Sequence, residues 1–192
     1  METTVRASIG HLSKVLSSDV IEEPFPHIYA EDVFTPERFE EIKANFPARS
    51  GKNSKEAIDL TGDFWEDMFN ERFRAAIMEK FKAREWESRQ VRAIHDNPGF
   101  VLGPHTDDAK KVISLIFYID GGPGTSIYVP KQEGFTHDGS AHLSFDDFIK
   151  FKEYGPKPNS MCGFRRINRS FHGVERVTAP RRTLLYNIYK AA

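Results

Sequence analysis

The residues best suited to chemistry lie in the stretch GPHTDD, residues 103–108, where a Gly-Pro turn precedes His105 and Asp107. In an extended chain, side chains two residues apart lie on the same face, so this imidazole and this carboxylate could reach one metal ion. A His-x-Asp pair alone is a weak signal, and His172 in NRSFHGVERV is the candidate third ligand. Two histidines and one carboxylate form the facial triad of non-haem Fe(II) oxygenases, which leaves positions open for substrate and O₂.

The remaining histidines carry less chemical information. His95 falls in a predicted strand, and His27 lies in the N-terminal part of the chain. For His11, His137 and His142 we favour a surface or hydrogen-bonded role over a place among the metal ligands.

Composition excludes several classes of protein. The 192 residues carry a net charge of -1, which gives no global attraction to nucleic acid or to an anionic membrane. The single cysteine, Cys162, excludes an intrachain disulfide and a multi-cysteine zinc site. No apolar run approaches the roughly 20 residues that a spanning helix needs, and residues 1–20 lack a signal-peptide pattern. We expect a cytoplasmic protein of one domain, residues 1–192.

The N-terminal part, residues 1–86, is expected to be mostly helical. Thr35 is a good N-cap and Pro36 suits the first position of a helix that ends at Pro47. Residues 48–62 are polar and predict a loop. Residues 62–86 predict one amphipathic helix or a pair of helices, because large apolar residues recur every fourth position: Phe69, Phe73, Ile77 and Phe81.

After Trp86 the pattern changes to short strands rich in β-branched and aromatic residues. The predicted strands are 89–96, 110–120, 125–130, 160–166 and 181–190. Turn sequences separate them, which predicts an antiparallel barrel or sandwich over residues 87–192 and an α+β, mainly β, fold class. Within the connection 131–159, the segment LSFDDFIKFKEYG predicts a helix capped by Ser144 that could serve as a lid.

Alternation along two strands indicates which side chains face a pocket. In 110–120 one face is wholly apolar and should pack on the helices, while the other carries Ser114 and Tyr118 and suits a pocket wall. In 181–190 Arg182 leads an apolar face and needs a partner. The far carboxylate of a dicarboxylate would match its guanidinium as a bidentate fork, and an ordinary ion pair with Asp or Glu is the alternative.

The order of GPHTDD, ISLIFYID, GTSIY, SFHGVERV and RRTLLYNIY resembles the Fe(II)/2-oxoglutarate-dependent dioxygenases, in particular the small prolyl-hydroxylase-like branch. The resemblance covers roughly residues 90–190 together with PFPHIYAEDVFTPERFEEI. It implies a double-stranded β-helix, or jelly roll, buttressed by N-terminal helices. It also implies Fe(II), 2-oxoglutarate and O₂ as cofactors and cosubstrates, with ascorbate as a further candidate reductant.

The resemblance assigns roles to individual residues. His105, Asp107 and His172 would be the catalytic iron ligands. Arg182 would hold the far carboxylate of 2-oxoglutarate, with Arg181 as its rival. The other residues assigned to the 2-oxoglutarate pocket are Tyr118, Ser114 and His95, the last at a position where relatives often have a tyrosine. Because relatives that halogenate lack the carboxylate ligand, Asp107 favours hydroxylation.

The substrate is the least determined feature. Candidate contacts are Arg92, Asn97, Tyr128, Arg166 and Asn168. The cluster of Arg165, Arg166 and Arg169 indicates an anionic group unless it is merely a solvated basic edge, and the small size favours a sugar, an amino acid or a related metabolite. The alternatives are a peptidyl, prolyl-type substrate or a non-catalytic jelly-roll binding module. A nucleic-acid demethylase is disfavoured because the chain lacks a strongly basic balance.

Overall fold

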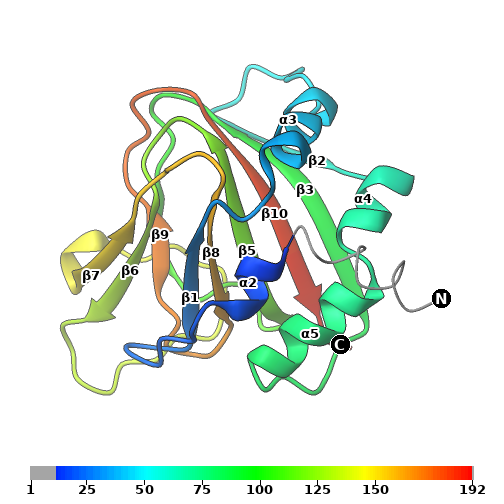
Figure 1. Cartoon of the computed structure of the whole chain (residues 1–192). Coiled ribbons are helices and arrows are strands. Elements are labelled where there is room, and N and C mark those ends of the chain that lie inside the picture. Colours follow the sequence, from blue (N-terminus) through cyan, green and yellow to red (C-terminus); the bar gives the residue numbers. More distant parts are fainter. Residues whose placement is uncertain (1–11, 192) are drawn as a thin grey trace.

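Two antiparallel sheets form the body of the protein, and the computed structural model describes residues 12–191 (Figure 1). The six-stranded sheet has the order β1 (His27–Glu31), β8 (Ser160–Arg165), β5 (Lys111–Asp120), β10 (Arg181–Tyr189), β3 (Ser88–Asp96) and β2 (Lys55–Asp59). The four-stranded sheet has the order β4 (Leu102–His105), β9 (His172–Val174), β6 (Thr125–Pro130) and β7 (Phe148–Tyr154). This arrangement is the expected jelly roll. No helix in residues 12–191 is long and apolar enough to cross a membrane.

In the described residues, four helices cover the outer face of the six-stranded sheet (Figure 1). They are α2 (Ser13–Ser17), α3 (Pro36–Asn45), α4 (Asp63–Met68) and α5 (Glu71–Lys80). Helix α3 begins as predicted, with the Thr35 side chain accepting a hydrogen bond from the Arg38 N–H and Pro36 in the first turn. The segment 62–86 is the pair of helices, because Asn70 caps α5 by accepting from the Phe73 N–H.

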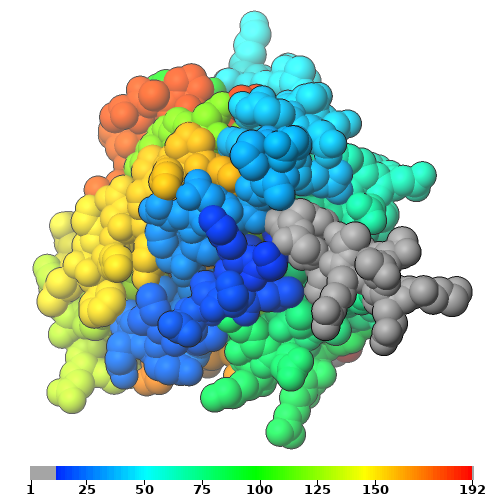
Figure 2. Space-filling model, in the orientation of Figure 1, coloured from blue at the N-terminus to red at the C-terminus, as the bar shows by residue number. Residues whose placement is uncertain are grey.

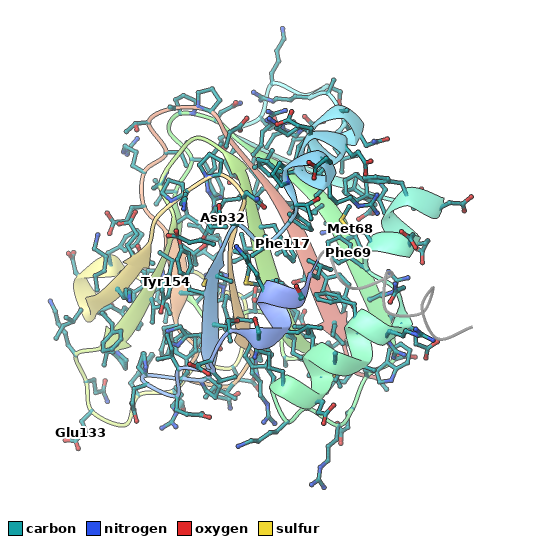
Figure 3. All side chains as sticks on the ribbon, in the orientation of Figure 1. Asp32, Met68, Phe69, Phe117, Glu133 and Tyr154 are labelled. Atoms are coloured by element: carbon teal, nitrogen blue, oxygen red, sulfur yellow. The ribbon has the colours of Figure 1, made fainter. Side chains whose placement is uncertain are left out.

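The main core lies between these helices and the sheet. Side chains of alternate residues in β5 and β10 enter it, and these include Ile113, Leu115, Phe117, Leu184, Tyr186 and Ile188. Figure 3 shows Met68 and Phe69 beside Phe117, and the rings of Phe69 and Phe117 lie 5.5 Å apart. The predicted apolar face of 110–120 is therefore confirmed, and Ser114 points the other way, toward the second sheet.

The N-terminal residues wrap around the sheet as well as covering it. In Figure 2 the blue residues of β1 and α2 lie across the front of the molecule, over the place where Figure 1 draws β8 and β5. Strand β1 pairs with β8, and β2 pairs with β3, so both edges of the large sheet come from the first 60 residues. The expectation of a mostly helical N-terminal part was thus incomplete, and the predicted loop 48–62 contains a strand.

The helix predicted in 131–159 is wrong. A single 3₁₀ turn at Phe145–Asp147, capped by Ser144, leads into strand β7, which pairs with β6. The spacing of three between Phe145, Phe148 and Phe151 imitated a helical stripe, yet Phe148 is buried and Phe151 is 52% exposed. The pairing with β6 decided the conformation of this segment, and a helical lid does not form there.

Candidate metal centre

The three predicted ligands meet between the two sheets. His105 ends β4, Asp107 follows two residues later, and His172 begins β9, directly opposite His105 in the strand register. The Nε2 atom of His105 lies 3.5 Å from Asp107 Oδ1, and that of His172 lies 3.6 Å from Asp107 Oδ2. All three residues are buried, and their ligand atoms lie within 4.8 Å of one another. A single metal ion could contact all three.

Backbone carbonyls orient both imidazoles. His105 Nδ1 lies 3.0 Å from the Gly103 carbonyl oxygen, and His172 Nδ1 lies 2.9 Å from the Ser170 carbonyl oxygen. A carbonyl oxygen only accepts, so each Nδ1 carries the hydrogen and donates it. Each Nε2 therefore presents its lone pair toward Asp107, which is the tautomer that a metal ligand needs.

Asp107 reaches the centre by a route that the sequence did not show. Its backbone φ is 70°, in the left-handed region, and strand β4 has already ended at His105. The two side chains therefore converge through a turn and not through an extended chain. The carboxylate accepts hydrogen bonds from Ser114 Oγ at 3.1 Å and from Lys111 Nζ at 2.8 Å. Aspartate tolerates this conformation better than most residues, and such backbone often marks a functional site.

The protonation states suit a cation. Burial lowers the pKa of His172 to about 3, so this imidazole is neutral near pH 7. Burial opposes the charge on Asp107, but its surroundings, which include the Lys111 ammonium at 2.8 Å, hold the pKa of that carboxyl well below its usual range. A neutral imidazole and an ionised carboxylate are the ligand forms of these groups. The donor set, the tautomers and the burial all fit a non-haem Fe(II) site of the two-histidine, one-carboxylate type.

The centre opens into a cavity of about 240 Å³ between the sheets. Its walls combine apolar residues with a larger number of polar and charged ones. The polar and charged residues are Lys55, Asp96, His105, Asp107, Lys111, Ser114, Thr125, Ser140, His142, His172, Arg181 and Thr183. Ser114 is thus in the wall, where the sequence placed it.

The arginine in this cavity is Arg181, and the expectation for Arg182 is wrong. Arg181 is 4% exposed, and its Nη1 donates to Asp96 Oδ2 at 2.5 Å. Arg182 points to the opposite side of β10, where its Nε donates to both oxygens of Asp120. That is the ordinary ion pair foreseen as its alternative. The apolar face that Arg182 leads packs on the helices, so the arginine on that face cannot reach the cavity.

Tyr118 and His95 do not present polar groups to the cavity. The Tyr118 hydroxyl donates to Thr125 Oγ1 at 2.7 Å and accepts from the Thr125 N–H at 3.0 Å, although its ring lies beside Arg181. His95 faces the outer side of β3, 3.0 Å from the Pro47 carbonyl oxygen. Both therefore have structural partners, and the place expected for His95 in a cofactor pocket is wrong.

The predicted substrate contacts lie outside the cavity wall. Tyr128 is on the outer face of β6, in an aromatic cluster with Phe148 and Phe171. Arg92 pairs with Asp59, and Asn97 donates to the Asn53 carbonyl oxygen. Arg166 and Asn168 bond each other, and Arg165 and Arg166 line a separate basic cleft. Alternation alone could not tell which face of each strand meets the cavity.

Four charged or titratable cavity residues were missed by the sequence interpretation. Asp96 and Lys111 had a detectable signal, because Asp96 ends a predicted strand next to His95 and Lys111 follows Asp107 by four residues. Lys55 lay in a predicted loop, and His142 lay in the predicted lid. The ring of His142 is 5.2 Å from that of His105, a contact that only the folded chain creates.

Sequence comparison finds no relative. No protein-family model and no curated protein sequence matches the chain. Solved structures do match. A prolyl-4-hydroxylase from Pseudomonas putida superposes with a TM-score of 0.60 at 12% identity, over 95% of this chain and 98% of that one. The chain has the fold of the 2-oxoglutarate/Fe(II) oxygenases.

Two further structures agree on that fold. A 2OG-Fe(II) oxygenase family protein from Burkholderia pseudomallei has a TM-score of 0.58 at 11% identity, over 85% of this chain and 84% of that one. A Trichoplax adhaerens prolyl hydroxylase, in complex with a hypoxia-inducible factor peptide, has a TM-score of 0.55 at 9% identity, over 98% and 91%.

Proposed function

We propose that this chain is an Fe(II)- and 2-oxoglutarate-dependent dioxygenase that hydroxylates an unactivated C–H bond of a small substrate. The observation that carries the proposal is the buried set of His105, Asp107 and His172 in one cavity with Arg181. Bound iron, with 2-oxoglutarate as the electron donor, would supply the O₂-dependent oxidation. The similarity of fold to known oxygenases supports this reading.

Different residues of the cavity would have different roles in this reaction. His105, Asp107 and His172 would hold the metal and leave its remaining positions facing the cavity. Arg181 would bind the far carboxylate of 2-oxoglutarate, since its Nε is buried without a hydrogen-bond partner and its guanidinium suits a carboxylate. Ser114 and Lys111 fix the orientation of the Asp107 carboxylate through their hydrogen bonds.

The size of the cavity supports a small substrate. A volume of about 240 Å³ must hold 2-oxoglutarate together with the reacting part of the substrate. A sugar, an amino acid or a related metabolite fits this space. The second candidate is a peptidyl, prolyl-type hydroxylase, which is favoured by the prolyl hydroxylases among the similar structures, one of them in complex with a peptide.

Metal and cosubstrate binding tests the proposal directly. Purified apoprotein would be mixed without oxygen with Fe(II) and then with 2-oxoglutarate, while the visible charge-transfer band is recorded. We expect a band in the wild type, loss of the band in Asp107→Ala, and an unchanged band in Asp108→Ala, whose exposed side chain accepts a hydrogen bond from the neighbouring Lys110 N–H.

Turnover to succinate under oxygen, with ascorbate added as a reductant, would then separate an oxygenase from a binding module. A folded, iron-loaded protein that gives no band and forms no succinate would refute the proposal and favour the binding module.

A further inference from the structure

The charged groups that line the cavity do not balance. Three of them are cationic, namely Lys55, Lys111 and Arg181, and two are carboxylates, Asp96 and Asp107. Lys111 contacts Asp107 at 2.8 Å, and Arg181 contacts Asp96 at 2.5 Å. Each carboxylate therefore has its own cation, and Lys55 is left over.

The side chain of Lys55 lines the cavity, where its ammonium can contact a bound ligand. It lies on the edge strand β2 directly opposite Asp96, so the two side chains share the face that meets the cavity. Its Nζ lies 5.2 Å from the centre of the Phe100 ring, and among the described residues no carboxylate comes within ion-pair distance of it. Lys55 is an exposed residue on this edge strand, and the burial of its ammonium side lowers its pKa, with Asp96 opposing that change.

Binding of Fe(II) and 2-oxoglutarate would not change the net positive charge of the cavity. Fe(II) would add two positive charges and 2-oxoglutarate two negative ones, so the sum over the cavity is unchanged. Arg181 would then be shared between Asp96 and the far carboxylate of the cosubstrate, so one positive charge remains over the cavity as a whole. An ammonium that lines the cavity and has no carboxylate within ion-pair distance is free to pair with an anionic group that a ligand brings.

We propose that Lys55 is a specificity-determining residue that binds an anionic group, a carboxylate, of the primary substrate. The proposal rests on the oxygenase function proposed above and narrows its substrate to one with a free acid. A peptidyl proline inside a chain is neutral and would leave Lys55 unpaired, so the charge favours a free acid over an internal peptidyl residue.

The basic cleft identified from Arg165 and Arg166 does not serve this purpose. It has a volume of about 380 Å³, and Lys111 is the one described residue that lines both this cleft and the cavity of the candidate metal centre. Arg166 is already paired with Asp138, and Arg165 donates to the Phe81 carbonyl oxygen. These arginines therefore do not support an anionic substrate in the cavity, whereas Lys55 does.

Matched pairs of acids and amides test the proposal. The probes are N-acetyl amino acids with their amides, and glucuronic acid with glucuronamide, so that the members of each pair differ in charge. Two quantities would be measured on the iron-loaded enzyme: the succinate formed above the uncoupled rate, and the dissociation constant of 2-oxoglutarate from the charge-transfer band. The variants are Lys55→Gln and, as the matched control, Lys52→Gln, an exposed lysine three residues earlier.

We expect at least one acid to be preferred over its amide by about tenfold in the wild type and in Lys52→Gln. Lys55→Gln should abolish this preference while changing the 2-oxoglutarate dissociation constant by less than about twofold. Two results would overturn the proposal: no acid is preferred over its amide, or Lys55→Gln weakens 2-oxoglutarate binding about tenfold, which would assign Lys55 to the cosubstrate. If the wild type shows no charge-transfer band with Fe(II) and 2-oxoglutarate, the oxygenase proposal is refuted, and the role inferred for Lys55 is refuted with it.

Discussion

Removing the guanidinium of Arg181 should damage the protein far more than removing that of its neighbour Arg182. The Arg181 and Asp96 side chains are 4% and 1% exposed, so Arg181→Gln leaves a buried carboxylate without its cation. Breaking a buried ion pair in this way costs about 3–5 kcal/mol. Arg182 and Asp120 are 35% and 42% exposed, and such a surface pair contributes about 0–1 kcal/mol.

The two variants are matched controls for each other, because they make the same chemical change at adjacent positions of β10. Urea unfolding of the iron-free protein would measure the free energy of unfolding for both. We expect a loss of about 3 kcal/mol or more in Arg181→Gln and of less than about 1 kcal/mol in Arg182→Gln. Adding Asp96→Asn to Arg181→Gln removes the unpaired charge and should recover most of the loss.

The same two variants should also differ in their affinity for 2-oxoglutarate. Hydrogen bonds to a charged group contribute about 1.5–3 kcal/mol, so Arg181→Gln should weaken 2-oxoglutarate binding roughly 10- to 100-fold. Arg182→Gln should leave it within about twofold. Equal effects of the two variants on stability, or a larger effect of Arg182→Gln on cosubstrate binding, would show that the faces of β10 have been assigned wrongly.

The remaining predictions concern pH and packing. Burial lowers the pKa of His172 to about 3, so between about pH 6.5 and 3 the unfolded chain binds a proton that the folded chain excludes. The free energy of unfolding that depends on neutral His172 is complete above about pH 6.5 and falls by about 1.4 kcal/mol per pH unit below it. Urea unfolding of the apoprotein at pH 7.5 and 5.5 should therefore show a larger loss of stability in the wild type than in His172→Asn. Equal losses in the two proteins would contradict the assignment. In Gly124→Ala the new Cβ would lie 1.5 Å from the Tyr154 carbonyl oxygen, so β6 and β7 must move apart. The thermal unfolding midpoint of this variant should drop by several degrees. The control is Gly139→Ala, whose new Cβ would lie 3.7 Å from its nearest neighbour and which should unfold like the wild type.

Local patterns in the sequence were enough to predict five of the ten strands in residues 12–191, the helical segment 62–86 and the three residues that converge in the candidate metal centre. Capping and alternation are properties of a few neighbouring residues, and for this reason Thr35 and the apolar face of 110–120 could be identified without a structure. Segments whose conformation depends on a partner strand were predicted wrongly. Strand β2, with three charged residues out of five, pairs with β3, and β7 pairs with β6.

The error at Arg182 shows where local patterns stop being informative. Alternation correctly placed Arg181 and Arg182 on opposite faces of the strand, and the wholly apolar face of 110–120 was correctly assigned to the helices. The apolar face of 181–190 packs on the same helices, which leaves Arg181 to the cavity. A strand has two faces in every fold, and only the packing of helices and sheets determines which of them encloses a cavity.

The sequence by itself determined the residue types and spacing of the metal site, because His105 and Asp107 are neighbours in the chain and His172 stands in a recognisable motif. The tertiary structure alone decided how the charges of the cavity are paired. Lys55, Asp96 and Arg181 are far apart in the sequence but adjacent across β2, β3 and β10, since their side chains share one row of the sheet. Coulomb energies depend on distance through space, so the unpaired ammonium of Lys55 could be seen only after the strands were in register.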